Sequence, residues 1–129
     1  MTNFEATNNQ STMVKSDIFW DIAAKVAEIC QVNIADMVND SREQSVVDAR
    51  ILTVQYAVRV GFSCSEIAEI ILLNSEKVID KDVLRKKARM VSNVYRAYMG
   101  RCQQNALFCI LSKEVKSWVK ETYGIGMDV

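Results

Sequence analysis

Apolar side chains recur at intervals of three and four residues along most of this chain, a spacing typical of amphipathic helices. The first such segment begins at Ser16, a residue suited to an N-cap, and extends to about Gln31. Its apolar positions are Ile18, Phe19, Ile22, Val26 and Ile29. Residues 1–15 are rich in Asn, Thr and Ser and have no such periodicity, so they predict a disordered leader.

Two further helices are expected before residue 61. Asn33 is a suitable cap for a short helix that carries Asp36 in its first turn and the apolar pair Met37 and Val38. The next helix begins near Asp48 and is apolar around much of its circumference, which predicts the central and most buried helix of the domain. Its apolar residues are Ile51, Val54, Tyr56, Ala57, Val58 and Val60.

A tight break follows at Gly61-Phe62, and the sequence then restarts as Ser63-Cys64-Ser65-Glu66. The Ser-x-x-Glu spacing predicts a capping box, in which Ser63 and Glu66 each accept a hydrogen bond from the other's backbone amide. The resulting fourth helix extends to about Leu72. A helix, a tight break and a newly capped short helix form the layout of a helix-turn-helix, which holds a following helix against a DNA groove.

The rest of the chain predicts two longer helices. The start of the first is ambiguous, because Asn74, Ser75 and Asp80 are all suitable caps. From Lys81 to about Cys102 the apolar positions form one continuous stripe: Leu84, Ala88, Val91, Tyr95, Tyr98 and Cys102. A last helix is expected from Ala106 to Thr122, with Gly124 as its terminating residue.

These elements predict an all-α fold, a compact bundle of five to seven helices. The expected domain spans residues 16–129. Its helix-turn-helix core lies at about 22–90, and extra C-terminal helices follow at about 91–123. Trp118 falls at helical spacing and is expected in the core, with a dimer contact as the alternative.

Composition narrows the classes of function. The chain has 129 residues, of which 16 are basic and 16 acidic. It contains no histidine, and histidine is both the usual general base near neutral pH and the commonest zinc ligand. None of the four cysteines forms a Cys-x-x-Cys pair, and we expect free thiols, no metal and no cofactor. The absence of a long apolar segment or a signal-peptide core predicts a cytoplasmic protein that is not inserted in a membrane. We do not expect an enzyme.

Charge is unevenly distributed despite the net value of zero. Residues 81–101 contain seven basic side chains against one acid, Asp82, whereas residues 63–80 are mainly acidic. On a helix, Arg85, Arg89 and Arg96 share one arc opposite the apolar stripe, with Lys86 beside it. A solvated outer face and a phosphate-facing surface both fit this pattern.

Residues from about Ile22 to Ala68 resemble the C-terminal DNA-binding domain of the bacterial replication initiator DnaA, a helix-turn-helix related in fold to the Trp repressor. The residues that carry this resemblance are Val26-Ala27-Glu28, Asn33-Ile34-Ala35-Asp36-Met37, Ser41-Arg42, Ser45-Val46-Val47, Arg50, Tyr56-Ala57 and Ser63-Cys64-Ser65-Glu66-Ile67. The resemblance implies a minor-groove approach by Arg50 and a backbone contact by the turn at Ser63–Ser65.

The leading hypothesis is therefore a small regulator of transcription or replication, from a bacterium or mobile element, that binds double-stranded DNA. The candidate contacts are Arg42, Arg50 and Ser65 for positioning, and Lys77, Lys81, Arg85, Lys86 and Arg89 for phosphate. The alternative is a protein-interaction module that kept the fold and lost DNA binding, with a homodimer or protein partner on the C-terminal helices. The resembled family reads bases in the major groove through an Asp-His-Ser-Thr signature, which is absent from this chain. The family's usual basic residues are also replaced, by Asp40, Glu43, Gln44 and Asp48, and their acids would repel phosphate. Both differences favour the alternative.

Overall fold

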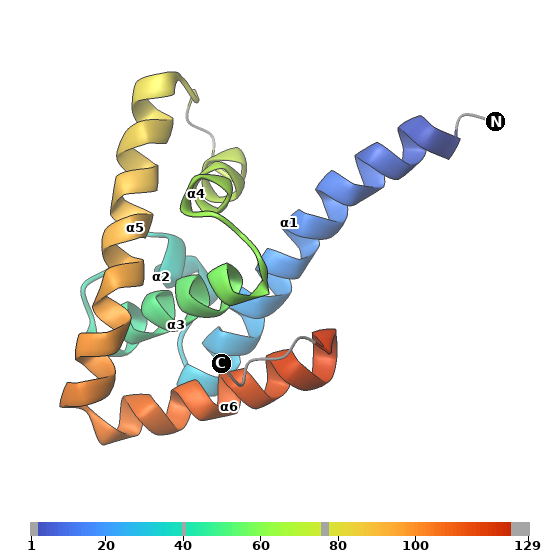
Figure 1. Ribbon diagram of the computed structural model, residues 1–129. Coiled ribbons are helices and arrows are strands. Elements are labelled where there is room, and N and C mark those ends of the chain that lie inside the picture. Colours follow the sequence, from blue (N-terminus) through green and yellow to red (C-terminus); the bar gives the residue numbers. More distant parts are fainter. Residues whose placement is uncertain (1–2, 40, 76–77, 125–129) are drawn as a thin grey trace.

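The computed structural model describes residues 3–39, 41–75 and 78–124, with side chains from Lys15 onward. All of the regular structure in these residues is helical, which confirms the expected all-α fold (Figure 1). The helices are α1 (Asn3–Cys30), α2 (Ile34–Val38), α3 (Gln44–Val60), α4 (Cys64–Leu73), α5 (Lys81–Gln104) and α6 (Ala106–Tyr123).

Helix α3 lies at the centre of the bundle, as its apolar sequence predicts. All of its residues from Ile51 to Ala57 are buried. One apolar cluster joins α3 to α1 and α6 and includes Ile22, Leu52, Phe108 and Val119. A second cluster joins α3 to α1, α4 and α5 and consists of Phe19, Val54, Ala57, Phe62, Ile67, Ala68 and Val91. Burial of apolar surface on both sides of α3 is the main source of stability for such a fold.

Helix α1 begins at Asn3 rather than at the predicted Ser16, so its backbone runs through most of the segment for which the sequence predicts a disordered leader. No glycine or proline lies between Asn3 and Ser16, and nothing in this stretch prevents the helix from extending toward the N-terminus. The helix ends at Cys30, where Gln31 adopts a left-handed conformation with φ of 58°.

The other helix boundaries agree with the sequence more closely. Asn33 caps α2 as expected, since its Oδ1 accepts a hydrogen bond from the Ala35 amide at 2.9 Å. Helix α3 begins at Gln44, four residues before the predicted start near Asp48, because Val46 is fully buried and extends the helix into the core. At the end of α6, Gly124 has a φ of 63° and terminates the helix as expected.

The turn between α3 and α4 has the geometry that the sequence predicts. Gly61 has a φ of 128°, a value that side chains disfavour, and it ends α3. Ser63 Oγ accepts a hydrogen bond from the Glu66 amide at 3.1 Å, and Glu66 Oε1 accepts one from the Ser63 amide at 3.0 Å. The capping box is therefore confirmed, and it fixes the direction in which α4 leaves the turn.

Candidate nucleic-acid interface

Helix α5 carries most of the predicted phosphate contacts, and its start is defined by Asp80. Asp80 Oδ1 accepts a hydrogen bond from the Val83 amide at 2.9 Å, which resolves the choice among the three candidate caps. Leu84, Ala88 and Val91 then pack toward α4 and α3, so one face of α5 is anchored in the bundle. Tyr95 differs from the predicted stripe, because it is exposed while Val94 packs inward.

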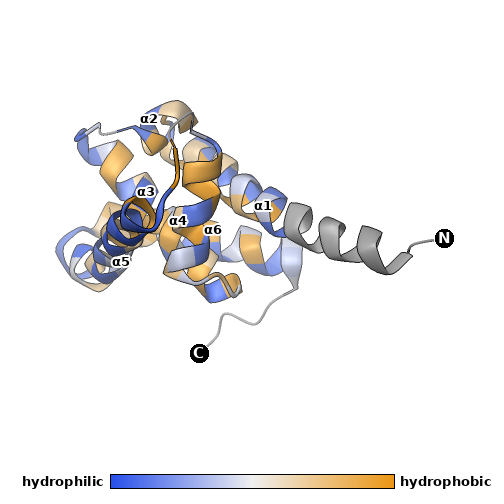
Figure 2. Ribbon diagram, turned by 90° about the horizontal axis from the view of Figure 1, so that it is seen from above, coloured by the Kyte–Doolittle hydropathy of each residue, from blue (hydrophilic) through white to orange (hydrophobic). Residues whose placement is uncertain are grey.

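The opposite face of α5 is basic and open to solvent. Four predicted contacts are exposed along it: Lys81, Arg85, Lys86 and Arg89. Arg96 is also exposed, and at 100° per residue Arg85, Arg89 and Arg96 fall within an arc of about 40°. Figure 2 shows α5 at the edge of the molecule, largely in the colours of hydrophilic residues.

Little intramolecular charge neutralises this face. The acid on α5, Asp82, lies 3.7 Å from Arg85, and both side chains are more than two-thirds exposed. Exposed pairs of this kind contribute little free energy and exchange readily with water or another anion. The outward surface of α5 can therefore accept a polyanion without first breaking a buried ion pair.

Two basic residues of α5 do not belong to this face. Arg101 points into the bundle and pairs with Asp48 of α3, with Nε 2.8 Å from Oδ1. Because Asp48 is paired with Arg101, the repulsion of phosphate expected from this acid is reduced. Lys87 lies on the inner side of the helix and lines a cavity. Its position could have been read from the sequence, because it is three residues after Leu84 and four before Val91.

Arg50 is engaged inside the protein rather than directed outward. Its Nε donates to the Met37 carbonyl at 2.7 Å and its Nη1 to the Ser41 carbonyl at 2.7 Å. Its Nη2 donates to the carbonyls of Asp36, at 3.0 Å, and Asn39. The guanidinium thus fixes the end of α2 and the following loop. This arrangement does not fit the minor-groove role that the family resemblance implies.

The remaining predicted contacts lie on other elements. Arg42 is exposed between α2 and α3, and Ser65 is exposed in the first turn of α4. Lys77 lies outside the described residues. The structure therefore unites four of the eight predicted residues on one helix face and places Arg42 and Ser65 on two separate elements.

The acidic start of α4 is also engaged. Glu66 Oε2 lies 2.8 Å from Lys15 Nζ, in addition to the capping hydrogen bond that Oε1 accepts. The hydrogen bond from Lys15, followed by the one from the Ser63 amide, lowers the pKa of Glu66. The carboxylate therefore serves the start of α4 and its connection to α1.

Two of the thiols, those of Cys30 and Cys102, are protected by their surroundings. All four cysteines are free and partly buried. Burial, with a smaller contribution from Asp48 and Glu114, raises the pKa of Cys30 to about 11, and burial also raises the pKa of Cys102. Thiols with raised pKa values are poor nucleophiles at neutral pH.

Within the described part of the chain, no three His, Cys, Asp or Glu side chains are grouped as metal ligands would be. Among the described helices, none has both the length and the apolar composition that crossing a bilayer requires. Comparisons with protein-family models, with curated proteins and with solved structures give no match.

Proposed function

We propose that this protein binds double-stranded DNA through the outward face of α5, in the manner of a divergent DnaA/Trp-repressor-like helix-turn-helix. The observation that carries the proposal is the exposed basic face made by Lys81, Arg85, Lys86, Arg89 and Arg96. Five exposed cations on one helix concentrate positive potential in a chain whose net charge is zero. Regulation of transcription or replication in a bacterium or mobile element is the corresponding biological role.

The position of α5 supports this proposal. Helix α4 packs on its inner face, and α4 is itself oriented by the capping box and the turn at Gly61. The outer face lies at the edge of the molecule, where an α-helix with its side chains fits the width of a major groove. Asn93, also exposed, lies on the same side of the helix, and an asparagine can form paired hydrogen bonds with adenine.

The roles of the remaining predicted residues follow from their positions. Arg42 and Ser65 are exposed on neighbouring elements and would contact the DNA backbone beyond α5. Arg50 would act indirectly, since its hydrogen bonds fix the loop that carries Arg42.

The experiment is an anisotropy titration of a mixed-sequence duplex at low salt. We expect the wild type to bind, and the double change Arg85→Glu plus Arg89→Glu to abolish binding while helical content is retained. Lys113→Glu plus Lys116→Glu on α6 is the matched control, because it makes the same change in net charge on another helix. Absence of wild-type binding at tens of micromolar, the weak end of ordinary non-specific affinity, would refute the proposal.

One observation favours the second candidate, a protein-interaction module. Met99, Leu107 and Ile110 are each more than half exposed near the junction of α5 and α6. Exposed apolar side chains that lie close together mark protein contacts more often than isolated ones do. If DNA binding is absent, the double change Leu107→Ser plus Ile110→Ser tests this candidate. Where the wild type self-associates, the variant should sediment as a smaller species; where the wild type captures a protein partner, the variant should not.

A further inference from the structure

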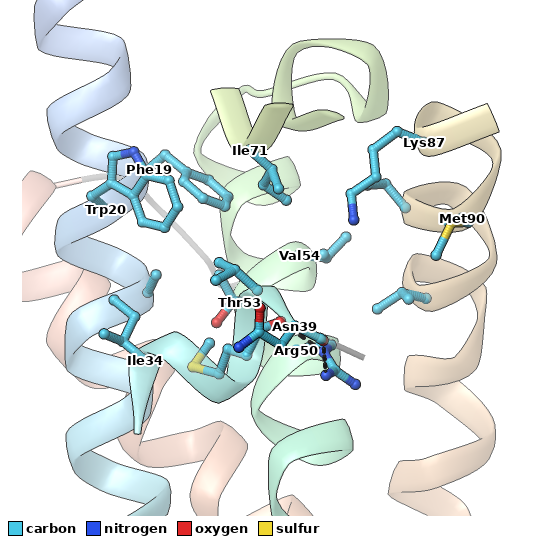
Figure 3. A pocket seen from close by; sticks show the side chains of 15 residues that line it. Phe19, Trp20, Ile34, Asn39, Arg50, Thr53, Val54, Ile71, Lys87 and Met90 are labelled. Atoms are coloured by element: carbon cyan, nitrogen blue, oxygen red, sulfur yellow. Dashed lines mark hydrogen bonds between the residues drawn. The ribbon is translucent and has the colours of Figure 1, made fainter. Parts of the chain in front are cut away.

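A cavity of about 160 Å³ lies on the inner side of α5, among five helices (Figure 3). Most of its lining is apolar, including Phe19 and Trp20 from α1, Met37 from α2, Val54 from α3 and Val91 from α5. Val38 and Met90, which are 37% and 51% exposed, also line it and place its mouth at the surface between α2 and α5.

Two polar side chains of the cavity wall, those of Arg50 and Thr53, form hydrogen bonds within the protein. Arg50 donates to the backbone carbonyls of Asp36, Met37, Asn39 and Ser41. Thr53 Oγ1 donates to the Ala49 carbonyl at 2.8 Å. These groups have little hydrogen-bonding capacity left for water inside the cavity, and an apolar space without polar partners is poorly hydrated.

Lys87 differs from Arg50 and Thr53. It lies on the inner face of α5, and Figure 3 shows its side chain crossing toward the other helices with the ammonium turned inward. Lysines on apolar faces usually extend the ammonium to water instead. No described acid forms an ion pair with Lys87, so an ammonium group next to an apolar space lacks a counter-charge.

We propose that this cavity binds a small organic carboxylate, with an aromatic ring or short alkyl chain inside and the carboxylate on Lys87. The size fits, because a cavity of about 150 Å³ in another protein accommodates benzene. Charge complementarity sets the sign of the ligand, since the ammonium favours an anion and disfavours an amine. The apolar lining requires that the part of the ligand inside the cavity be apolar, since Phe19, Val54 and Val91 offer no partner for a second polar group.

The test uses the full chain, without DNA, so that its outcome is independent of the function proposed above. Binding of phenylacetate and of the neutral analogue 2-phenylethanol is followed by calorimetry and by amide chemical shifts. We expect saturable binding of phenylacetate with shifts at residues that line the cavity. Lys87→Met keeps an unbranched apolar side chain and removes the ammonium group, and it should weaken phenylacetate binding roughly tenfold without weakening 2-phenylethanol binding.

A second variant tests the location of the site. Val91→Phe should occupy the cavity and abolish binding of both compounds; if it does not fold, Met90→Trp at the mouth serves the same purpose. Lys86→Met, on the outward side of the same helix, is the matched control and should leave both affinities unchanged.

Three outcomes would overturn the proposal. The first is the absence of saturable phenylacetate binding up to about 10 mM. A dissociation constant of that size corresponds to a binding free energy of only a few kcal/mol. The second is an equal loss for Lys86→Met and Lys87→Met. The third is a concentration-dependent dimer that Met90→Asp converts to monomer, since a second copy would then cover the cavity mouth.

Discussion

Arg101 of α5 contacts both carboxylate oxygens of Asp48 on α3, with Nε 2.8 Å from Oδ1 and Nη2 3.1 Å from Oδ2. The two side chains are only 20% and 12% exposed. The hydrogen bond from Arg101 to the carboxylate raises the pKa of the guanidinium. This pair connects the central helix to the helix that carries the basic face.

The first prediction concerns this pair. Arg101→Met leaves the Asp48 carboxylate with only Gln44, whose Nε2 lies 2.8 Å from Oδ1, and should lower the free energy of unfolding in urea. Arg101→Lys should recover part of the loss, because an ammonium cannot make the paired contact. Arg96→Met on the exposed face of the same helix should have little effect. An equal loss for Arg96→Met and Arg101→Met would show that the pair contributes nothing.

The second prediction separates a structural role of Arg50 from a role in DNA recognition. Arg50→Ala removes the donor to the carbonyls of Asp36, Met37, Asn39 and Ser41 and should lower the free energy of unfolding by about 1–3 kcal/mol without DNA present. Arg42→Ala, a change at an exposed residue between α2 and α3, should change stability by less than about 0.5 kcal/mol. Unchanged stability in Arg50→Ala, together with loss of DNA binding, would mean that Arg50 contacts a DNA groove directly and has no structural role.

Local features of the chain were predictable because they depend on neighbouring residues. The turn at Gly61 and the capping box of Ser63 and Glu66 depend on four or five adjacent residues, and both are present. The start of α5 was ambiguous, since three residues nearby could act as a cap. Asp80 is the cap, whereas Asn74 and Ser75 belong to the end of α4, where their amides donate to the carbonyls of Ile71 and Leu72.

Contacts between distant residues were not predictable. Asp48 and Arg101 are 53 positions apart, and the loop carbonyls that Arg50 contacts depend on how α2 folds back onto α3. No pattern in the sequence assigns an arginine to a backbone carbonyl rather than to phosphate. Lys87 is different, because its spacing from Leu84 and Val91 already places it on the apolar side of α5.

The third prediction concerns alkaline pH. Cys30 has a pKa near 11 in the folded protein, compared with an ordinary value of 9.0, because burial disfavours the thiolate. The folded state therefore retains this proton more strongly than the unfolded state does. The associated stability is complete below pH 9 and is lost as pH rises toward 11.

The measurement is the free energy of unfolding between pH 8 and about 11, for the wild type and for Cys30→Ala. We expect a shallower decline in the variant, with a difference below about 2 kcal/mol because the thiol is only partly buried. Parallel curves for wild type and Cys30→Ala would contradict the assignment.

The last prediction concerns the salt dependence of DNA binding. If Arg85 and Arg89 contact phosphate, their replacement by Gln removes two ionic contacts and should reduce the slope of log affinity against log salt by roughly 2 units, since each contact releases about one counterion. Lys113→Gln plus Lys116→Gln makes the same change in net charge on α6 and should leave the slope unchanged. An equal reduction in both double variants would mean that the protein responds to overall charge and that α5 has no special role. A reduction confined to the α5 variant would assign the phosphate contacts to this helix, because the two proteins differ only in where the charges were removed.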